Sequence, residues 1–241
     1  MVALLKGRNN MKRTLLALAT IGTIGSAQAL SLVQSGTPTV KPAGSSTLFN
    51  AVGTLNFGNQ KARLEGSGFT TIQGGNPGNG WFNNVTRSWE VKWDNTNKKV
   101  SFKLYHTADW SGAEATNGLM TAAPSFGVGN QLVGLSIGYR LSSTGQSVTL
   151  DNIQFDDGSG FVDVNTAEGA FASPAFADNY HAFAGTMTDW TLRGTTIFPT
   201  GTTTGDSMRF FVTGVQAVPE PGTMAALALG AGALIRRRRA K

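Results

Sequence analysis

Two runs of alternating residues around a short polar turn constrain this chain more than any other feature. Between residues 88 and 105, apolar and polar residues alternate on both sides of the stretch 94–99. A period of two places every apolar side chain of a strand on one face, so the pattern predicts an antiparallel hairpin with one buried face. The row expected in the core is Trp89, Val91, Trp93, Val100, Phe102 and Leu104.

Further short strands are expected at intervals along the chain. Alternating or apolar runs occupy residues 133–139, 148–155, 161–164, 190–192 and 208–215, with turns rich in Gly, Asn, Ser and Thr between them. In the second run the apolar phase changes, and a bulge near Asp151-Asn152 would restore it. Outside the two ends, no amphipathic helix of three turns is visible in the sequence. The chain is therefore predicted to be all-β, an antiparallel β-sandwich of the jelly-roll type.

Charge is distributed unevenly along the 241 residues. The formal net charge is +6, yet residues 30–218 hold 11 Lys and Arg against 13 Asp and Glu, and the excess of cations lies near the two ends. The mildly acidic body argues against nucleic-acid binding. Cysteine is absent, so disulfides, thiol nucleophiles and cysteine metal sites are excluded.

The first 29 residues have the pattern of a secretory signal peptide. A basic stretch around Lys12 and Arg13 precedes a ten-residue apolar run at 15–24, and small residues Ala27 and Ala29 frame a cleavage site. Cleavage is expected after Ala29, by way of the secretion translocon. Whether Met1 or Met11 is the start is left open.

The last 24 residues form a second targeting pattern. The motif Pro219-Glu220-Pro221 is followed by an apolar run at 223–235 and by four arginines, Arg236, Arg237, Arg238 and Arg239. The prolines prevent a regular helix from continuing into the body. As a helix, the 13 apolar residues would reach about 20 Å, short of the ~30 Å hydrocarbon core. The arginines are expected to stay cytoplasmic.

This tail resembles the PEP-CTERM sorting signal of exported bacterial proteins. The resemblance covers residues 218–241 and consists of three features in fixed order: the Pro-Glu-Pro motif, the apolar run and the arginine cluster. It implies an exosortase-type sorting enzyme as a partner, a transient inner-membrane tail, and a final place at the cell surface or outside the cell. It also implies a link to exopolysaccharide. A plain tail anchor is the alternative.

The expected organisation has four parts. They are a signal peptide at 1–29, a linker or irregular first strand at 30–53, a β-sandwich domain at 54–217, and a sorting tail with a short transmembrane segment at 218–241.

Catalytic constellations are weak in the body. Gly134 to Gly138 match the nucleophile-elbow pattern around Ser136, with His181 and Asp178 as formal partners, but that motif needs a strand-to-helix turn and here it lies inside a strand. The five glutamates show no paired arrangement for glycosidic cleavage. The chain is therefore expected not to be an enzyme.

Two kinds of binding residue remain as candidates. Trp81 and Trp110 lie in loop-like segments where an indole can serve as a platform for a sugar ring. Calcium prefers oxygen-rich loops, and the candidate ligands are Asp151, Asp156, Asp157 and Asp163. A plain solvated turn is the preferred explanation of these acids, because Asp-Gly turns are common without a metal, so no cofactor is expected.

Two functions follow from these patterns. The first is an exported, non-catalytic surface or extracellular-matrix protein sorted by its tail. The second is a lectin-like module that binds exopolysaccharide, with calcium as an optional aid.

Overall fold

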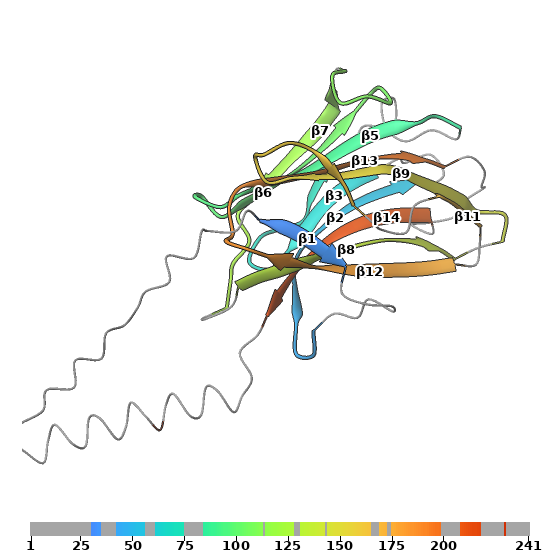
Figure 1. The fold of residues 1–241 in the computed structure, drawn as a ribbon. Helices are drawn as coiled ribbons and strands as arrows, with labels where there is room; N and C mark the ends of the chain where they lie inside the picture. The colour runs from blue at the N-terminus through green and yellow to red at the C-terminus, as the bar shows by residue number, and fades with distance from the viewer. Residues whose placement is uncertain are drawn as a thin grey trace, which may run out of the picture.

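The computed structural model describes residues 30–34, 42–55, 61–74, 84–112, 114–127, 131–142, 144–164, 169–172, 175–198, 208–217 and 229. Within the body these residues form strands and connecting turns, and no helix (Figure 1). The strands are β1 (Ser31–Gln34), β2 (Ser46–Leu55), β3 (Lys61–Gly66), β4 (Ile72–Gly74), β5 (Arg87–Asp94), β6 (Lys99–Tyr105), β7 (Glu114–Ala122), β8 (Gln131–Leu141), β9 (Ser147–Asp156), β10 (Val162–Asp163), β11 (Gly169–Ala172), β12 (Ala175–Ala184), β13 (Trp190–Ile197) and β14 (Met208–Ala217).

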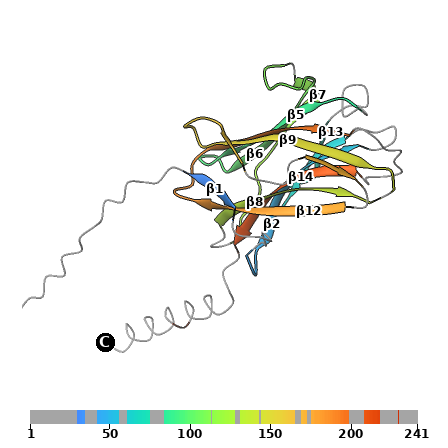
Figure 2. The same cartoon turned by 45° about the vertical axis from the view of Figure 1, so that its right-hand side comes forward.

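The strands form two antiparallel sheets that pack face to face. The first sheet has the order β1-β12-β8-β14-β2-β3-β4. The second has the order β10-β9-β13-β5-β6-β7, with β11 also pairing with β9. Figures 1 and 2 show the two layers, the second sheet above the first. The predicted β-sandwich is confirmed.

The hairpin β5–β6 matches its prediction closely. Trp89 pairs with Leu104, and Val91 pairs with Phe102. The whole predicted apolar row is at most 2% exposed, whereas Glu90 is only half-buried and Lys92 is exposed on the other face.

The predicted bulge is present in β9. Between the pairing positions of Arg193 and Thr195, β13 has one residue, whereas the facing part of β9 has two. Asn152 has a φ of 52°, in the left-handed region that asparagine tolerates better than most residues. The extra residue lets Leu150 and Ile153 both enter the core, where they are at most 1% exposed.

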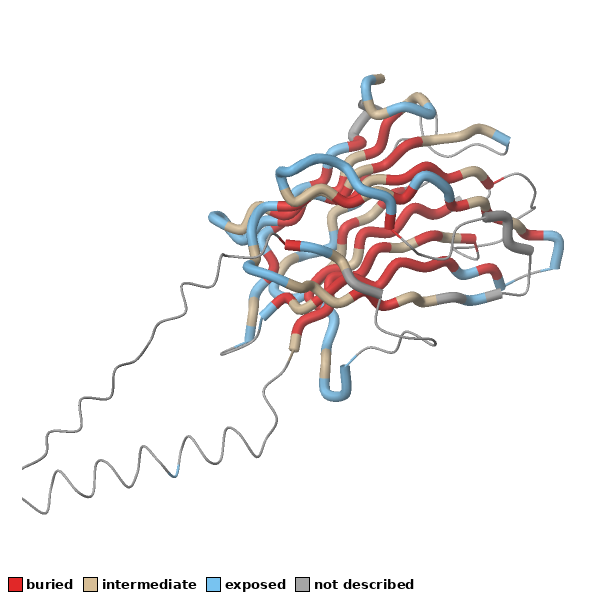
Figure 3. Tube along the Cα trace, viewed as in Figure 1, coloured by how far each residue is buried: buried red, intermediate tan, exposed pale blue. Residues whose placement is uncertain are grey.

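Aromatic rings from both sheets fill the core. Trp89 stacks on Phe210 with ring centroids 5.0 Å apart, which joins β5 to β14 across the sandwich. Gly53 lies beneath the same phenyl ring, and a Cβ there would come within 2.1 Å of Cε1 of Phe210. The close approach of backbone and ring therefore requires a glycine at this position. Figure 3 shows buried residues along both layers.

Two sequence expectations about boundaries need correction. β1 pairs with β12, and β2 lies between β14 and β3, so the sandwich begins well before residue 54. The Ser/Thr/Gly-rich composition of residues 30–53 concealed these strands. The strand expected at 161–164 is reduced to Val162–Asp163, both exposed.

Two further expectations fall outside the described residues. These are the signal helix at 1–29 and, apart from Leu229, the apolar helix at 223–235. In the part of the chain that the structure describes, no helix is long and apolar enough to span a bilayer.

Candidate functional site

Trp110, one of the two tryptophans predicted to contact sugar, is half-buried beside a cation. It lies in the loop between β6 and β7, and its Nε1 donates a hydrogen bond to the carbonyl oxygen of Trp89 at 3.2 Å. The guanidinium carbon of Arg193 lies 4.1 Å from the centre of the indole. The indole therefore already has a cation over its ring. Trp81 lies outside the described residues, and sugar contact at both positions stays a prediction.

Arg193 organises a set of residues that we call the Arg193 cluster: Arg193, Trp110, Phe161, Gln154 and Asp163. Its guanidinium also lies 3.3 Å from the centre of the Phe161 ring. Nε and Nη2 donate to Oε1 of Gln154 at 3.0 and 2.8 Å, and Nε2 of Gln154 donates to Asp163 at 3.0 Å. Burial lowers the pKa of Arg193, opposed by Glu90 and Asp156. The cluster binds the β6–β7 and β9–β10 loops to β13.

The four aspartates predicted as calcium ligands have different surroundings. Asp156 accepts hydrogen bonds from the amides of Gly158 and Gly160 at 2.7 and 2.9 Å. Asp157 accepts from the Ser159 amide and hydroxyl, and the hydroxyl bond is the main cause of its lowered pKa. These two carboxylates hold their own turn.

The other two aspartates are engaged elsewhere. Asp163 belongs to the Arg193 cluster, and Asp151 accepts a hydrogen bond from the Asn152 amide at the bulge. Among the described residues, no group of three or more Asp, Glu or His side chains is arranged to hold a metal ion. Calcium at these positions stays a prediction.

The formal triad residues lie on both sides of the first sheet. Ser136 is fully buried and donates a hydrogen bond to Asp178. It pairs with Tyr180, so the next residue of β12, His181, faces the opposite side with Leu135. His181 is 1% exposed, its Nε2 has no hydrogen-bond partner, and burial lowers its pKa to about 4. The geometry therefore does not pair this serine with this histidine.

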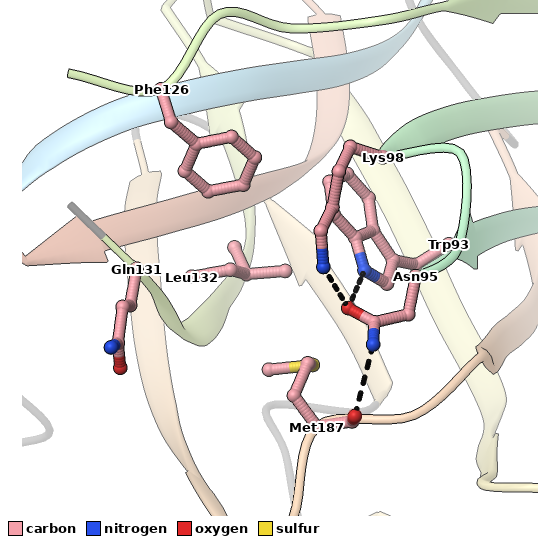
Figure 4. A pocket seen from close by; sticks show the side chains of 7 residues that line it. All are labelled: Trp93, Asn95, Lys98, Phe126, Gln131, Leu132 and Met187. Atoms are coloured by element: carbon pink, nitrogen blue, oxygen red, sulfur yellow. Dashed lines mark hydrogen bonds between the residues drawn. The ribbon is translucent and has the colours of Figure 1, made fainter. Parts of the chain in front are cut away.

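A hollow at one end of the sandwich was not predicted from the sequence. It encloses about 420 Å³, a volume typical of small ligand sites. Figure 4 shows Phe126 and Leu132 across the hollow from Trp93 and Lys98, with Met187 at one side. We call it the end pocket, and its lining residues are Trp93, Asn95, Lys98, Phe126, Gln131, Leu132 and Met187.

Asn95 joins the two loops that border the end pocket. Its Nδ2 donates to the carbonyl oxygen of Met187 at 3.0 Å, and its backbone amide donates to Asp189 at 2.8 Å. Its Oδ1 accepts from Nζ of Lys98 at 2.7 Å and from the indole N–H of Trp93 at 3.4 Å (Figure 4). One side chain thus ties the β5–β6 turn to the β12–β13 loop.

Lys98 has an unusual backbone for its residue type. Its φ is 51°, in the left-handed region where turns normally place Gly, Asn or Asp. Within the part of the chain that the structure describes, its ammonium bonds to the neutral Asn95 amide and forms no ion pair. The only sequence signal for this site was the polar turn at 94–99, and the hydrophobic walls come from distant segments.

A comparison with protein families assigns a class to the end of the chain. The model for the PEP-CTERM protein-sorting motif matches residues 217–239, which include the Pro-Glu-Pro triplet and the arginine cluster. The match supports the predicted exosortase substrate, and the motif implies export toward the cell envelope and processing by that sorting enzyme. A comparison with curated proteins gave no match. The sorting residues and Ala27 and Ala29 lie outside the described residues.

Proposed function

We propose that this chain is an exported, non-catalytic surface or extracellular-matrix protein that its tail delivers to a sorting enzyme. The observation that carries the proposal is that the sorting motif begins where the last strand of the sandwich ends. β14, which lies between β8 and β2, ends at Ala217, and the matched sorting motif begins at residue 217. Cleavage within the Pro-Glu-Pro region would therefore leave in place every strand of the sandwich that the structure describes.

The arrangement of the body supports a structural or adhesive role. Following the chain, β2, β8, β12 and β14 lie in the first sheet, while β5, β9 and β13 lie in the second. Such interleaving suits the jelly-roll interpretation, a fold in which sites are carried on a rigid scaffold. The separation of Ser136 from His181 by the sheet favours a role without serine catalysis.

The test is intact mass of the protein recovered from its native host, fraction by fraction. We expect an extracellular or surface species that begins at Leu30 and ends between Pro219 and Pro221. Replacing Pro219, Glu220 and Pro221 together by alanine should hold the full tail in the membrane fraction, whereas Thr204→Ala should be processed normally. A wild-type protein that keeps its arginine tail in the membrane would contradict the proposal.

A second candidate function, binding of exopolysaccharide, is favoured by a stacked aromatic pair on the outer face of the first sheet, in which Phe176 is exposed and Phe211 is half-buried. Phe176 is 65% exposed and stacks on Phe211, with ring centroids 6.1 Å apart. Arg140 is exposed and pairs with Phe176 in register, and Arg209 pairs with Arg140 on the other side. A sugar ring can pack on such a platform, and a guanidinium can bind an acidic substituent.

This candidate is tested by retention of the full chain on exopolysaccharide purified from its host. Phe176→Ala should weaken retention several-fold. Leu119→Ala is the matched control, because Leu119 is also exposed, at 51%, but lies on β7 of the other sheet. Equal retention of both variants and the wild type would show that the aromatic pair does not bind the exopolysaccharide.

A further inference from the structure

The end pocket has a chemical character distinct from the rest of the surface. Its apolar walls are formed by Phe126, Leu132 and Met187, and the Trp93 indole lies across the hollow from Phe126 and Leu132 (Figure 4). Phe126 meets the Trp93 indole edge to face, with centroids 5.9 Å apart. This pair gives the hollow a rigid aromatic side. A flat or ring-shaped apolar group is the shape that such walls accommodate.

A single cation lies at the edge of these apolar walls. The ammonium of Lys98 has three N–H donors, and among the residues that the structure describes its partner is the neutral Oδ1 of Asn95. The two acids nearest in sequence to the bordering loops are engaged by amides: Asp94 accepts from Asn97, and Asp189 accepts from Asn95. The ammonium is therefore held by a neutral group at the edge of the pocket.

The backbone at Lys98 is a second and independent observation. A lysine at a φ of 51° occupies a conformation that glycine or asparagine adopts at lower cost. Residues kept in such conformations cluster at binding sites, where the strain places a side chain. The neighbouring residue Asn97 would suit the left-handed position better, yet the lysine occupies it. This choice makes sense if the ammonium at the pocket has a ligand.

We infer that the end pocket binds a carboxylate carried on a six-membered ring, with the carboxylate on the Lys98 ammonium and the ring against Phe126 and Met187. Two sources share this chemistry, aromatic acids and uronic acids of polysaccharides. Gln131, exposed at the opposite wall, offers an amide to a polar edge of the ring. The site goes beyond the proposed function, since export and sorting do not depend on it.

The test is a saturation-transfer NMR titration of the purified full chain with benzoate and with glucuronate. For a ligand this small, a Kd on the order of 0.1–1 mM is expected. Lys98→Asn keeps a residue suited to the left-handed backbone and should weaken binding at least tenfold. Lys103→Asn is the matched control: its Nζ lies over Tyr105, 4.6 Å from the ring centre, outside the pocket, and binding should be unchanged. Benzamide, which has the ring without the charge, should bind at least tenfold more weakly than benzoate.

Each outcome has a defined meaning. Binding of benzoate alone identifies an aromatic-acid site, and binding of glucuronate, with or without benzoate, identifies a sugar-acid site. If neither binds, or if Lys98→Asn binds as well as the wild type, the inference is overturned. Because sorting is measured by mass in the host, failure here leaves the proposed function standing, and failure of sorting leaves the pocket standing.

Discussion

The Arg193 cluster and the end pocket contain similar residues and use them differently. In the cluster, a guanidinium lies against two aromatic rings and donates two hydrogen bonds to Gln154. In the pocket, an ammonium lies beside an aromatic wall, bonds to one neutral amide and borders a hollow of about 420 Å³. The cluster has its interactions satisfied within the fold, whereas the pocket leaves a cation and an apolar surface for a ligand.

Geometry explains the difference. Arg193 extends from the middle of the second sheet, where Glu90 and Gln154 are its cross-strand neighbours on β5 and β9. Lys98 extends from a hairpin turn at the end of the sandwich, where loops rather than strands surround it. A planar fork with several donors suits a crowded polar face, and a point charge on a flexible stem suits an open edge.

The largest effect on stability is expected from removing the Arg193 guanidinium. Arg193→Ala loses contacts with two rings and the pair of bonds to Gln154, and should lower the free energy of unfolding by about 3 kcal/mol. Arg193→Lys should recover part of this loss, because it keeps the charge without the fork. Urea denaturation measures both. A loss below about 0.5 kcal/mol for the alanine variant would mean that the cluster does not stabilise the fold.

The pH dependence of stability tests His181, a buried group outside both the Arg193 cluster and the end pocket. Between pH 7 and pH 5, His181 binds a proton more readily in the unfolded chain than in the folded chain, because its folded pKa of about 4 is below its ordinary value of 6.5. The unfolded chain binds the proton first, so stability falls as pH drops below about 6.5 and stops falling below about 4. We expect a loss of about 2 kcal/mol between pH 7 and pH 5.

The control for this pH effect is His181→Leu, which places an apolar group of similar size in the core. Its unfolding free energy should vary much less over the same range in urea titrations. If the two proteins respond to pH equally, His181 is not the group responsible.

Asn95→Ala tests whether Asn95 holds together the two loops that border the end pocket. The change removes the bonds to Lys98, Trp93 and Met187, and we expect a loss of 1–2 kcal/mol in unfolding free energy, as for a partly buried hydrogen-bonding group. Asn97→Ala is the matched control, because its bonds are confined to Asp94 in the exposed turn. Equal losses would show that Asn95 has no special role.

The smallest effect on stability is expected at Lys98. Lys98→Asn replaces a strained residue by one that tolerates the left-handed region, so the unfolding free energy should stay level or rise by up to about 1 kcal/mol. Thermal or urea unfolding measures this. A loss above 1 kcal/mol would mean that the lysine serves the fold, and the contrast with Arg193 would disappear.

Local patterns predicted much of this molecule. The hairpin β5–β6 followed from alternation, and the bulge at Asn152 followed from a change of apolar phase. Both features are determined by residues close together in the sequence, so the periodicity of apolar residues predicts them. The boundary at residue 54 failed because the buried residues of β2 do not alternate: Leu48 and Phe49 are adjacent and both fully buried, and Phe49 stacks on Trp93 of the second sheet.

The two sites depend on contacts between residues far apart in the sequence, which the periodicity of apolar residues does not predict. Trp110 and Arg193 meet only because β5 and β13 pair, although the two residues are far apart in sequence. The end pocket unites the β5–β6 turn with Phe126 and Met187, which come from two other loops. An alternating pattern tells which face a residue occupies, but not which distant loop folds over it.

The most direct test of the contrast is a map of backbone amide chemical shifts during a benzoate titration of the full chain. We predict changes at the end pocket, in residues 94–98, 126, 131–132 and 187, and none at Trp110, Gln154, Phe161 or Arg193. Changes centred on the Arg193 cluster, or no changes anywhere, would contradict the claim that one region is closed and the other open.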